Sequence, residues 1–539
     1  MLAGAMKQLE VRGVGGHPVS YGTKANLDVR LRNVLTPVKE MGLAGGRLAA
    51  RVQQAMHQIP EAELRDMLGE IDRRARAEHL IYLRDEVEET IRLLPTPITA
   101  LPDQLAYVRA ATLTLHGALK RLPELYLEDP DVRALLALPD HEEAWLRRYW
   151  TPAVSEQNTV VGRHDAVIDF GSPGWKDSLQ FLEPNLGGIG GLHLIPTASH
   201  ILAEVVLPVL RARDPQLELE VGQDLRALLM QDLLDHLETT GRPGRTVCFV
   251  EPKYAGYGPD EQGELARYIH EHFGVEVCHA DPAELALDGD EVTYQGRVID
   301  LIYRDYAVED LLDLEAEGVD VRPMRQAFAT NRVVSSIAAE LDQKSCWEVL
   351  GDPVLARRHF SGEERAFFRR HLPWTRVLRP GTTSLPDGSK GSLIDYVTRT
   401  REELVLKPNR SYGGNGVTVG PVTGAAEWKK VVDAALAPGG ERWVAQRLVP
   451  LPVCQFPTLA TDGTINNQPF YVVFGFAPSA YGLATLGRAS QAQVVNVAQR
   501  GGMCVLVVGH PPGQIVQAGP PVHVGIPAQK PVRAQGTKT

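Results

Sequence analysis

The spacing of hydrophobic residues predicts a helical beginning to the chain. From Glu61 to Leu94 apolar side chains recur every three or four residues, which is typical of an amphipathic helix. Prolines then interrupt the pattern, and a second helix is predicted from Asp103 to Leu122, with shorter helices as far as Trp150. Residues 1–60 carry weaker patterning and are expected to be peripheral. We therefore expect residues 1–155 to form a helical accessory region.

Beyond residue 155 short apolar strands alternate with helices. Strands are expected at Ala166–Ile168 and Leu179–Leu182. A strand at Arg245–Glu251, a helix at Asp260–Phe273 and a strand at Val275–His279 have short connections, which predicts a parallel α/β unit. Further helices are expected at His200–Arg213, Gly222–Thr240, Val308–Glu317, Met324–Leu341, Ser389–Thr400 and Glu427–Leu436, and further strands at Val298–Tyr303, Leu404–Leu406, Trp443–Gln446, Phe470–Phe474 and Val494–Val497.

The end of the sequence differs in composition from the rest. From Val508 onward proline, glycine, glutamine and lysine dominate. Such a segment lacks the apolar side chains that a core needs, so residues 508–539 are expected to form a disordered tail.

Charge and cysteine usage narrow the class of protein. The chain has 539 residues, with 56 basic and 67 acidic side chains and a net charge of −11, which argues against a nucleic-acid-binding surface. No apolar run approaches the roughly 18 residues needed to span a membrane, and the amino terminus does not resemble a signal peptide. Five scattered cysteines without CxxC spacing indicate a reducing compartment and no structural zinc. We expect a soluble cytoplasmic protein without nucleic-acid or membrane partners.

The stretch from Leu404 to Gly420 carries the first candidate chemistry. A short buried strand ends at Lys407, a polar glycine-rich loop follows, and a strand resumes at Val417. Glycines let backbone N–H groups approach an anion, and a lysine supplies a point charge for phosphate. The loop lacks the GKS or GKT of a P-loop, and a long glycine-rich hairpin remains the alternative. The candidate phosphate-binding residues of the loop are Ser411, Gly413, Gly414 and Gly416.

A second candidate site follows the strand at Leu179–Leu182. Glu183 and Asn185 occupy alternate positions, so their side chains share one face, and their oxygens suit Mg²⁺. Upstream, Asp165 and Asp169 lie near Arg163, and an adjacent antiparallel strand would bring one of them beside Glu183. The alternative is an ordinary turn at the end of a strand.

Three further residues are weaker candidates. Gln446 belongs to an apolar strand whose backbone could read an adenine edge, although a plain core strand explains the same pattern. Arg488 lies between small residues near a strand and is a candidate phosphate clamp. Lys344 is either a second phosphate lysine or a helix surface group. Motifs for a serine nucleophile, a zinc protease or a dinucleotide-binding turn are absent from the sequence.

Together these motifs resemble the ATP-grasp superfamily. The strand lysine of that family resembles Lys407 in VLKPNRSYGGNGV, and its Glu-x-Asn metal motif resembles Glu183 and Asn185 in FLEPNLGG. The resemblance implies Asp165 as the other metal ligand, with Asp169 in reserve, and an adenine strand similar to Trp443–Arg447.

The order of these motifs is that of circularly permuted ATP-grasp proteins, which include relatives of glutathionylspermidine synthetase. The metal motif precedes the lysine loop, and IYRDY, LDQKSCWEVL and GRAS…VVNVAQRGG also look like that group. The resemblance covers roughly residues 155–505. Two departures are Arg447, where an acidic residue is usual, and Gln343-Lys344, where Asn-Lys is usual.

The resemblance implies a fold and a division of the chain. The fold class is α/β (α+β), with the ATP-grasp fold in permuted order. The implied divisions are the helical accessory region at 1–155, the metal-site part of the core at 156–240, an α/β pre-ATP-grasp-like unit at 241–345, the lysine-loop and adenine-binding part at 346–507, and the tail at 508–539.

The resemblance also implies an activity. An ATP-dependent ligase would join a small-molecule or peptide carboxylate to an amine, or to a thiol, through an acylphosphate. ATP and Mg²⁺, with Mn²⁺ as the alternative metal, are the implied cofactors. Lys407 and Arg488 would act catalytically, and Lys344, Lys407, Arg488, Gln446 and the loop residues would bind nucleotide. A small-molecule kinase, an inactive nucleotide-binding protein and a homo-oligomeric state all remain compatible with the sequence.

Overall fold

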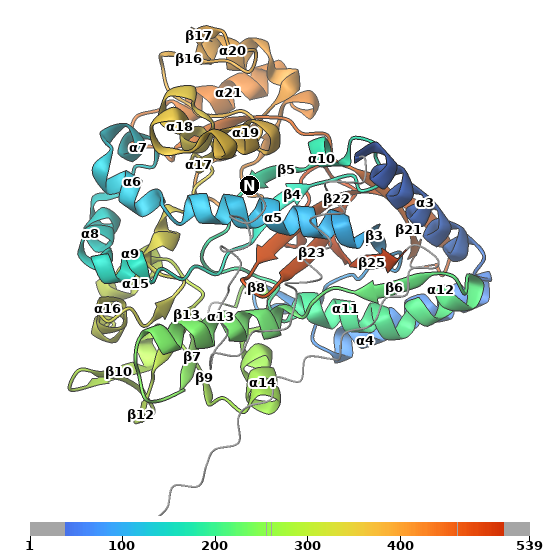
Figure 1. Ribbon diagram of the computed structural model, residues 1–539, viewed down its shortest axis with the longest axis horizontal. Coiled ribbons are helices and arrows are strands. Elements are labelled where there is room, and N and C mark those ends of the chain that lie inside the picture. Colours follow the sequence, from blue (N-terminus) through green and yellow to red (C-terminus); the bar gives the residue numbers. More distant parts are fainter. Residues whose placement is uncertain (1–37, 255, 260, 461, 511–539) are drawn as a thin grey trace, which may run out of the picture.

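The computed structural model describes residues 38–254, 256–259, 261–460 and 462–510, and these residues form a mixed α/β protein (Figure 1). The expected tail beyond residue 510 and the first 37 residues lie outside this described part. The mixed α/β class expected from the sequence is confirmed.

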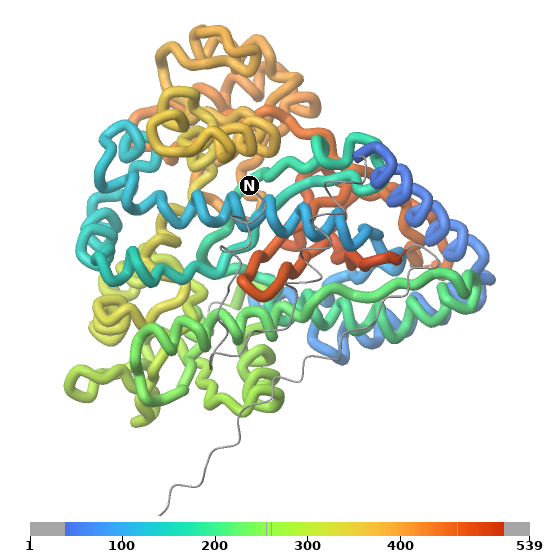
Figure 2. The backbone as a smooth tube through the Cα atoms, in the orientation of Figure 1, coloured from blue at the N-terminus to red at the C-terminus, as the bar shows by residue number. Residues whose placement is uncertain are grey.

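The central sheet joins strands from both ends of the described chain. Its order is β24-β23-β22-β4-β5, and β21 pairs with β22. In Figure 2 the red late segments lie beside teal early ones at this sheet. The register pairs Asp165 of β4 with Gly475 of β22 and with Glu183 of β5. Its strands are β4 (His164–Val167), β5 (Gln180–Glu183), β21 (Val453–Leu459), β22 (Ile465–Pro478), β23 (Leu483–Ser490) and β24 (Gly502–Cys504).

A second antiparallel sheet carries the lysine loop. Its order is β15-β20-β18-β19, and β18 pairs along its whole length with β20. A separate small core, centred on the fully buried Trp428, lies behind it and is covered by α20 (Leu393–Arg399) and α21 (Ala425–Ala435), at the top of Figure 1. The strands are β15 (Thr375–Val377), β18 (Leu404–Pro408), β19 (Thr418–Val419) and β20 (Trp443–Arg447).

A third sheet is parallel, as the strand–helix–strand pattern predicted. All three of its strand pairs are parallel, in the order β14-β13-β7-β9. Its two central strands, β7 and β13, are fully buried, which explains their apolar sequences. They are β7 (Val247–Val250), β9 (Val277–Ala280), β13 (Leu301–Arg304) and β14 (Val333–Val334).

Smaller sheets tie distant segments together. One joins β3 (Ile98–Ala100), β25 (Leu506–His510) and β6 (Glu218–Val221). Another joins β1 (Ile81–Arg84), β2 (Val87–Thr90) and β8 (Gly258–Pro259). The remaining strands are β10 (Leu285–Asp288), β11 (Glu291–Tyr294), β12 (Arg297–Val298), β16 (Thr382–Ser384) and β17 (Lys390–Ser392).

Helices surround these sheets. Helix α5 packs against β22 of the central sheet. The helices that precede α20 in the described chain are α3 (Val38–His57), α4 (Glu61–Ala77), α5 (Pro102–Leu119), α6 (Leu122–Glu128), α7 (Pro130–Leu135), α8 (Asp140–Tyr149), α9 (Pro152–Glu156), α10 (Trp175–Ser178), α11 (Leu194–Val205), α12 (Leu207–Arg213), α13 (Leu225–Thr239), α14 (Gln262–Phe273), α15 (Val308–Ala316), α16 (Arg322–Ala329), α17 (Cys346–Gly351), α18 (Pro353–His359) and α19 (Gly362–His371). The 3₁₀ turns are Pro282–Glu284, Ile337–Leu341, Arg401–Glu403, Gly420–Val422 and Val497–Gln499.

The expectation of one helix from Glu61 to Leu94 is wrong in its second half. Helix α4 ends at Ala77, and β1 and β2 form a hairpin whose turn residues Asp85 and Glu86 have φ of 49° and 66°. The apolar spacing misled because β1 is held by β8, a partner far away in sequence that no local pattern reveals. The region expected to be helical also contains strands β1, β2 and β3. Residues 38–57 are not peripheral, since α3 buries Met41, Leu48 and Val52 in the main core.

Other element boundaries also differ from expectation. The helix expected at Met324–Leu341 ends at Ala329, because Val333 and Val334 join the parallel sheet instead. Residues 494–497 form no strand, since Asn496 caps a 3₁₀ turn with its side chain. Residues 390–392 are a strand before α20, and Val508 lies inside β25 rather than in a tail.

The expectation that no stretch of the chain is apolar enough to span a membrane is wrong for one stretch of the described chain, which passes on length and composition. It runs from Leu194 to Arg213 with mean hydropathy 1.4. More than half of it is buried, with Ile201 and Leu210 in the main core, so it packs as the helices α11 and α12 of a folded domain.

Candidate functional site

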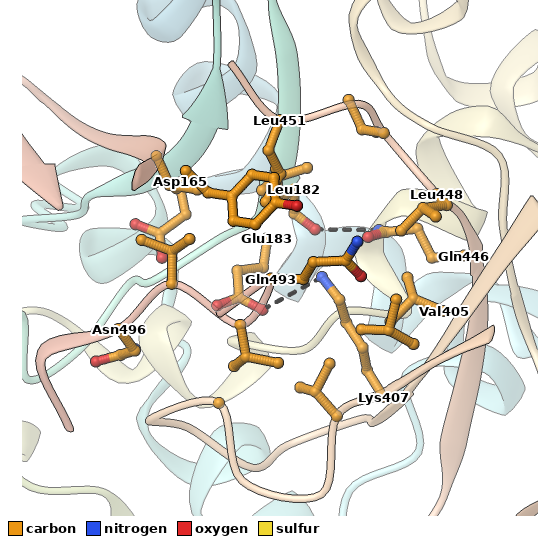
Figure 3. A pocket seen from close by; sticks show the side chains of 18 of the residues that line it. Asp165, Leu182, Glu183, Val405, Lys407, Gln446, Leu448, Leu451, Gln493 and Asn496 are labelled. Carbon is orange, nitrogen blue, oxygen red and sulfur yellow. Dashed lines mark hydrogen bonds and ion pairs between the residues drawn. The ribbon is translucent and has the colours of Figure 1, made fainter. Parts of the chain in front are cut away.

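A cavity lies between the central sheet and the lysine-bearing sheet. Its volume is about 190 Å³. Figure 3 shows that Glu183 reaches into it from one side and Lys407 from the other. Eight of the candidate residues chosen from the sequence line it together: Asp165, Glu183, Lys344, Lys407, Ser411, Gly414, Gln446 and Arg488.

Two lysines share one carboxylate oxygen in this cavity. Lys344 Nζ lies 3.7 Å and Lys407 Nζ 3.8 Å from Glu183 Oε2. Both lysine side chains are about 10% exposed. Burial lowers the pKa of Lys407, and the neighbouring Glu183 partly opposes this. Two positive charges are therefore balanced by a single carboxylate, which favours the binding of an added anion.

On the central sheet, Asp165 is held between two arginines. Arg488 Nη2 lies 2.7 Å from Asp165 Oδ2, and Arg163 Nε lies 3.3 Å from Oδ1. Burial alone would raise the pKa of Asp165, but Arg488 and Arg163 outweigh it and hold the pKa low. Arg488 Nε is buried and has no hydrogen-bond partner in the described part of the chain. A donor of this kind is suited to an anion that enters the cavity.

The expected metal ligands fit a cation only in part. Glu183 faces the cavity, whereas Asn185 does not line it, and its amide Nδ2 donates to the Arg163 carbonyl at 3.0 Å. That bond leaves Asn185 Oδ1 as the atom available for a cation. Asp165 is engaged by the two arginines, and Asp169 is exposed and caps its own turn at Gly171. Among the described residues no group of three or more His, Cys, Asp or Glu side chains forms a metal cluster.

A buried carboxyl joins the metal motif to the second lysine. Asp342 Oδ2 accepts from the backbone N–H of Leu186 at 2.6 Å, immediately after the Glu183–Asn185 motif. Burial raises the pKa of Asp342 to about 7. This contact fixes the turn after Asn185 beside the segment that carries Lys344.

The inner end of the cavity is apolar. Gln446 donates its side-chain Nε2 to the Leu182 carbonyl and to Thr375 Oγ1, at 3.0 and 3.1 Å (Figure 3). Its backbone lies inside the sheet, where it pairs with Thr375 of β15 and Val405 of β18. Arg447 lines the rim without an ion-pair partner among the described residues. The apolar side chains here are Leu182, Val405, Val419, Leu448, Val449, Leu451, Tyr471, Val473 and Val495. The alternate residues Tyr471 and Val473 of β22 were not identified from the sequence, although their period of two places them on one face.

Two loops cover the polar end of the cavity. In the glycine-rich loop, Gly414 lies on the cavity with φ of 77°, and a Cβ there would meet Val494 at 2.8 Å. Gly413 and Gly416 do not line the cavity. The second loop runs from residue 491 to residue 501, between β23 and β24, and supplies Gln493 and Asn496, both seen in Figure 3. The chain therefore passes close to itself where the loops meet.

A buried hydrogen-bond network sets the two lysines side by side. The Asn409 side chain accepts from Ser345 N at 2.8 Å and donates to Gln343 Oε1 at 2.9 Å. The backbone carbonyl of Asn409 accepts from Lys344 N at 3.1 Å. Gln343 in turn donates to the Leu136 carbonyl. The sequence did not identify Asn409, whose position two residues after Lys407 was the only available signal.

The charges that line the cavity are unbalanced. Among the side chains that line the cavity, the cations Lys344, Lys407, Arg447 and Arg488 outnumber the carboxylates Asp165 and Glu183 by two. In a chain with a net charge of −11 this is a local reversal of sign. The arrangement suits a ligand with an apolar planar part at one end and an anionic part at the other.

The fold is similar to that of a glutathione synthetase-like effector from Globodera pallida, solved in the apo form. The match covers 84% of this chain and 98% of that chain, with a TM-score of 0.55 and 12% sequence identity. No family model matches the sequence, and no curated protein matches it. At this identity the similarity shows the fold alone: this chain shares a mixed α/β fold with that effector.

Proposed function

We propose that this protein is an ATP-dependent ligase with the ATP-grasp fold in circularly permuted order. It joins a carboxylate to an amine, or to a thiol, through an acylphosphate. The observation that carries the proposal is the convergence of Lys344 and Lys407 on one oxygen of Glu183, inside a cavity with two excess positive charges. A magnesium-bound nucleoside triphosphate carries about two negative charges near neutral pH and would balance them.

Each side chain then has a role that follows from its position. The base would occupy the apolar end, against the backbone of β20 and Tyr471. Lys344 and Lys407 would leave Glu183 and bind phosphate oxygens. Glu183 and the Asn185 amide oxygen would hold Mg²⁺, or Mn²⁺, with Asp165 as the third ligand only if it exchanges an arginine for the metal. When bound, the metal supplies neutralisation of the charge that develops on the phosphates.

The chemical step would use position and charge rather than a protein nucleophile. A substrate carboxylate attacks the γ-phosphorus, and the bond to ADP breaks, which leaves an acylphosphate. The amine or thiol then attacks the acyl carbon, and phosphate leaves. Arg488 Nε, the unpartnered donor, would stabilise the transferred phosphoryl group, and the two loops would exclude water.

Three measurements test this proposal. Calorimetry should detect ATP binding that requires Mg²⁺ or Mn²⁺, and ATP with metal should raise the melting temperature by mass action. A screen of amino acids, peptides, polyamines and thiols for coupled release of ADP and free phosphate would then identify the substrates. Absence of any ATP binding would refute the proposal. ADP release with a phosphorylated product and without free phosphate would indicate a kinase instead.

A further inference from the structure

The second loop over the cavity is held by an arginine from the N-terminal hairpin. Arg84, at the end of β1, donates from Nη1 to the Ala498 carbonyl at 2.6 Å and from Nη2 to the Val497 carbonyl at 2.9 Å. Its Nε donates to Glu89 at 2.6 Å, and its guanidinium lies 4.5 Å from the centre of the Tyr82 ring. All three nitrogens of the guanidinium and one of its faces are therefore engaged, which fixes its position.

The segment that Arg84 holds is connected to the glycine-rich loop. Gln499 Nε2 lies 3.2 Å from both the Gly413 carbonyl and Asn415 Oδ1. A Cβ on Gly413 would lie 3.5 Å from the Ala498 side chain. Residues 497–499 thus contact the hairpin on one side and the glycine-rich loop on the other.

The hairpin makes a second contact with this turn. Arg500 follows Gln499 and pairs with Glu89 at 3.0 Å, and Glu89 is also the partner of Arg84. Arg500 itself is 75% exposed, so this outer pair contributes little, whereas the Arg84 side chain is 17% exposed. Arg84 is the stronger of the two attachments.

We propose that Arg84 is a positioning residue for the nucleotide site: it holds residues 497–499 so that Gln499 keeps the glycine-rich loop closed over bound triphosphate. The inference rests on the proposed function, and it assigns a role to the N-terminal hairpin, which contributes no side chain to the cavity lining. Because Arg84 binds backbone carbonyls, the contact does not depend on the side chains of the held segment.

The chain provides a matched control. Like Arg84, Arg109 of α5 binds backbone carbonyls. It donates to those of Ser479, Ala480 and Gly482, in the turn between β22 and β23. That turn does not line the cavity. Arg109→Ala therefore removes a comparable clamp elsewhere on the central sheet.

The experiment compares wild type, Arg84→Ala, Gln499→Ala, the double variant and Arg109→Ala. Calorimetry with ATP and Mg²⁺ should give about tenfold weaker binding for Arg84→Ala, because hydrogen bonds from a charged donor are lost, and unchanged binding for Arg109→Ala. Arg84 acts on the glycine-rich loop only through the segment that carries Gln499. The double variant should therefore bind ATP no more weakly than the more weakly binding of the two single variants.

Trypsin cleavage after Arg500, identified by mass spectrometry, reports the same contact directly. ATP should slow this cleavage in wild type and in Arg109→Ala, and the protection should be lost in Arg84→Ala. If Arg84→Ala does not fold, Gln499→Ala, which leaves the hairpin intact, must still lose the protection. Wild-type protein that does not bind ATP would refute the proposed function. Wild type that binds ATP, together with an Arg84→Ala variant that matches it in affinity and protection, would refute the role of Arg84 alone.

Discussion

Lys344 and Lys407 direct their ammonium nitrogens at the same oxygen of Glu183, at 3.7 and 3.8 Å. They come from different segments, which the Asn409 side chain joins. Two buried cations and one carboxylate form an arrangement that tolerates an incoming polyanion, because the anion removes a repulsion between lysines as it binds. Glu183 thereby serves as the counter-ion of the cavity before a ligand enters.

Replacing Glu183 with Gln should destabilise the ligand-free protein. The two lysines would lose their shared carboxylate, and we expect the free energy of unfolding to fall by about 1–2 kcal/mol, less than for a fully buried pair because Glu183 is 26% exposed. Urea unfolding without nucleotide measures this. The same variant should lose the metal-dependent binding of ATP, and with it most of the ATP-induced rise in melting temperature.

A control for that variant is Glu427→Gln. Glu427 pairs with Lys430 on the exposed surface of α21, where both side chains are more than 60% exposed. Its loss should change the free energy of unfolding by no more than about 0.5 kcal/mol. Equal stability of the two variants would contradict the counter-ion role of Glu183.

Arg488→Lys should impair chemistry more than binding. Lysine can still pair with Asp165, but it has no group at the position of Arg488 Nε, the donor without a partner in the described chain. We expect kcat to fall by about 100-fold, with the dissociation constant for ATP changed by less than about threefold. Single-turnover kinetics would separate the two effects. A large loss of ATP affinity with kcat unchanged would assign Arg488 to nucleotide binding instead.

Asn409→Ala should separate the two lysines. The change removes two buried hydrogen bonds to the residues on either side of Lys344, at a cost of about 2 kcal/mol of stability. Asn158→Ala is the control, since Asn158 is also a buried amide bonded to Lys120 and Ser336, away from the cavity. Both variants should lose similar stability by urea unfolding, but only Asn409→Ala should weaken ATP binding, by about tenfold. Parallel losses in ATP affinity would show that Asn409 is structural only.

The sequence predicted the site residues that local pattern can encode. Lys407 ends an apolar strand before a glycine-rich loop, and Glu183 ends another, so strand periodicity sufficed to select them. The structure brings these residues together because Asp165 and Glu183 lie on neighbouring strands of one sheet while Lys407 lies on the other. Their pairing across the cavity depends on how two sheets face each other, which no local spacing contains.

What the sequence missed depends on contacts between distant segments. Arg84 was placed in a helix, because the apolar residues around it are spaced like helical ones, and its contact with Val497 becomes visible only when the hairpin packs against the second loop. Gln446 was expected to offer its backbone to an adenine edge, and this stays a prediction; the structure adds that its side chain donates to Leu182 and Thr375. Val333 and Val334 were predicted to be helical, but they pair in parallel with Ile302 and Tyr303 of β13. In each case tertiary pairing outweighed local preference.

The last prediction concerns pH and lies outside the site. Asp232 lies partly buried on α13 and accepts a hydrogen bond from Ser479 Oγ at 2.9 Å. Burial raises its pKa to about 7, above the ordinary value of 3.8. The folded state therefore binds this proton more tightly than the unfolded state. Its contribution to stability is full below about pH 4 and is lost as the pH rises through about 7.

Asp232→Asn should remove that loss, because an amide oxygen can still accept from Ser479 and never ionises. Relative to wild type, the variant should gain stability as the pH rises from about 4 to about 8, by at most about 4 kcal/mol. Urea unfolding at a series of pH values gives the difference curve. Asp387→Asn is the control: bonding to Ser389 lowers the pKa of the exposed Asp387, so its difference curve should be flat above about pH 5. A flat curve for Asp232→Asn as well would mean that Asp232 is ionised and solvated at neutral pH.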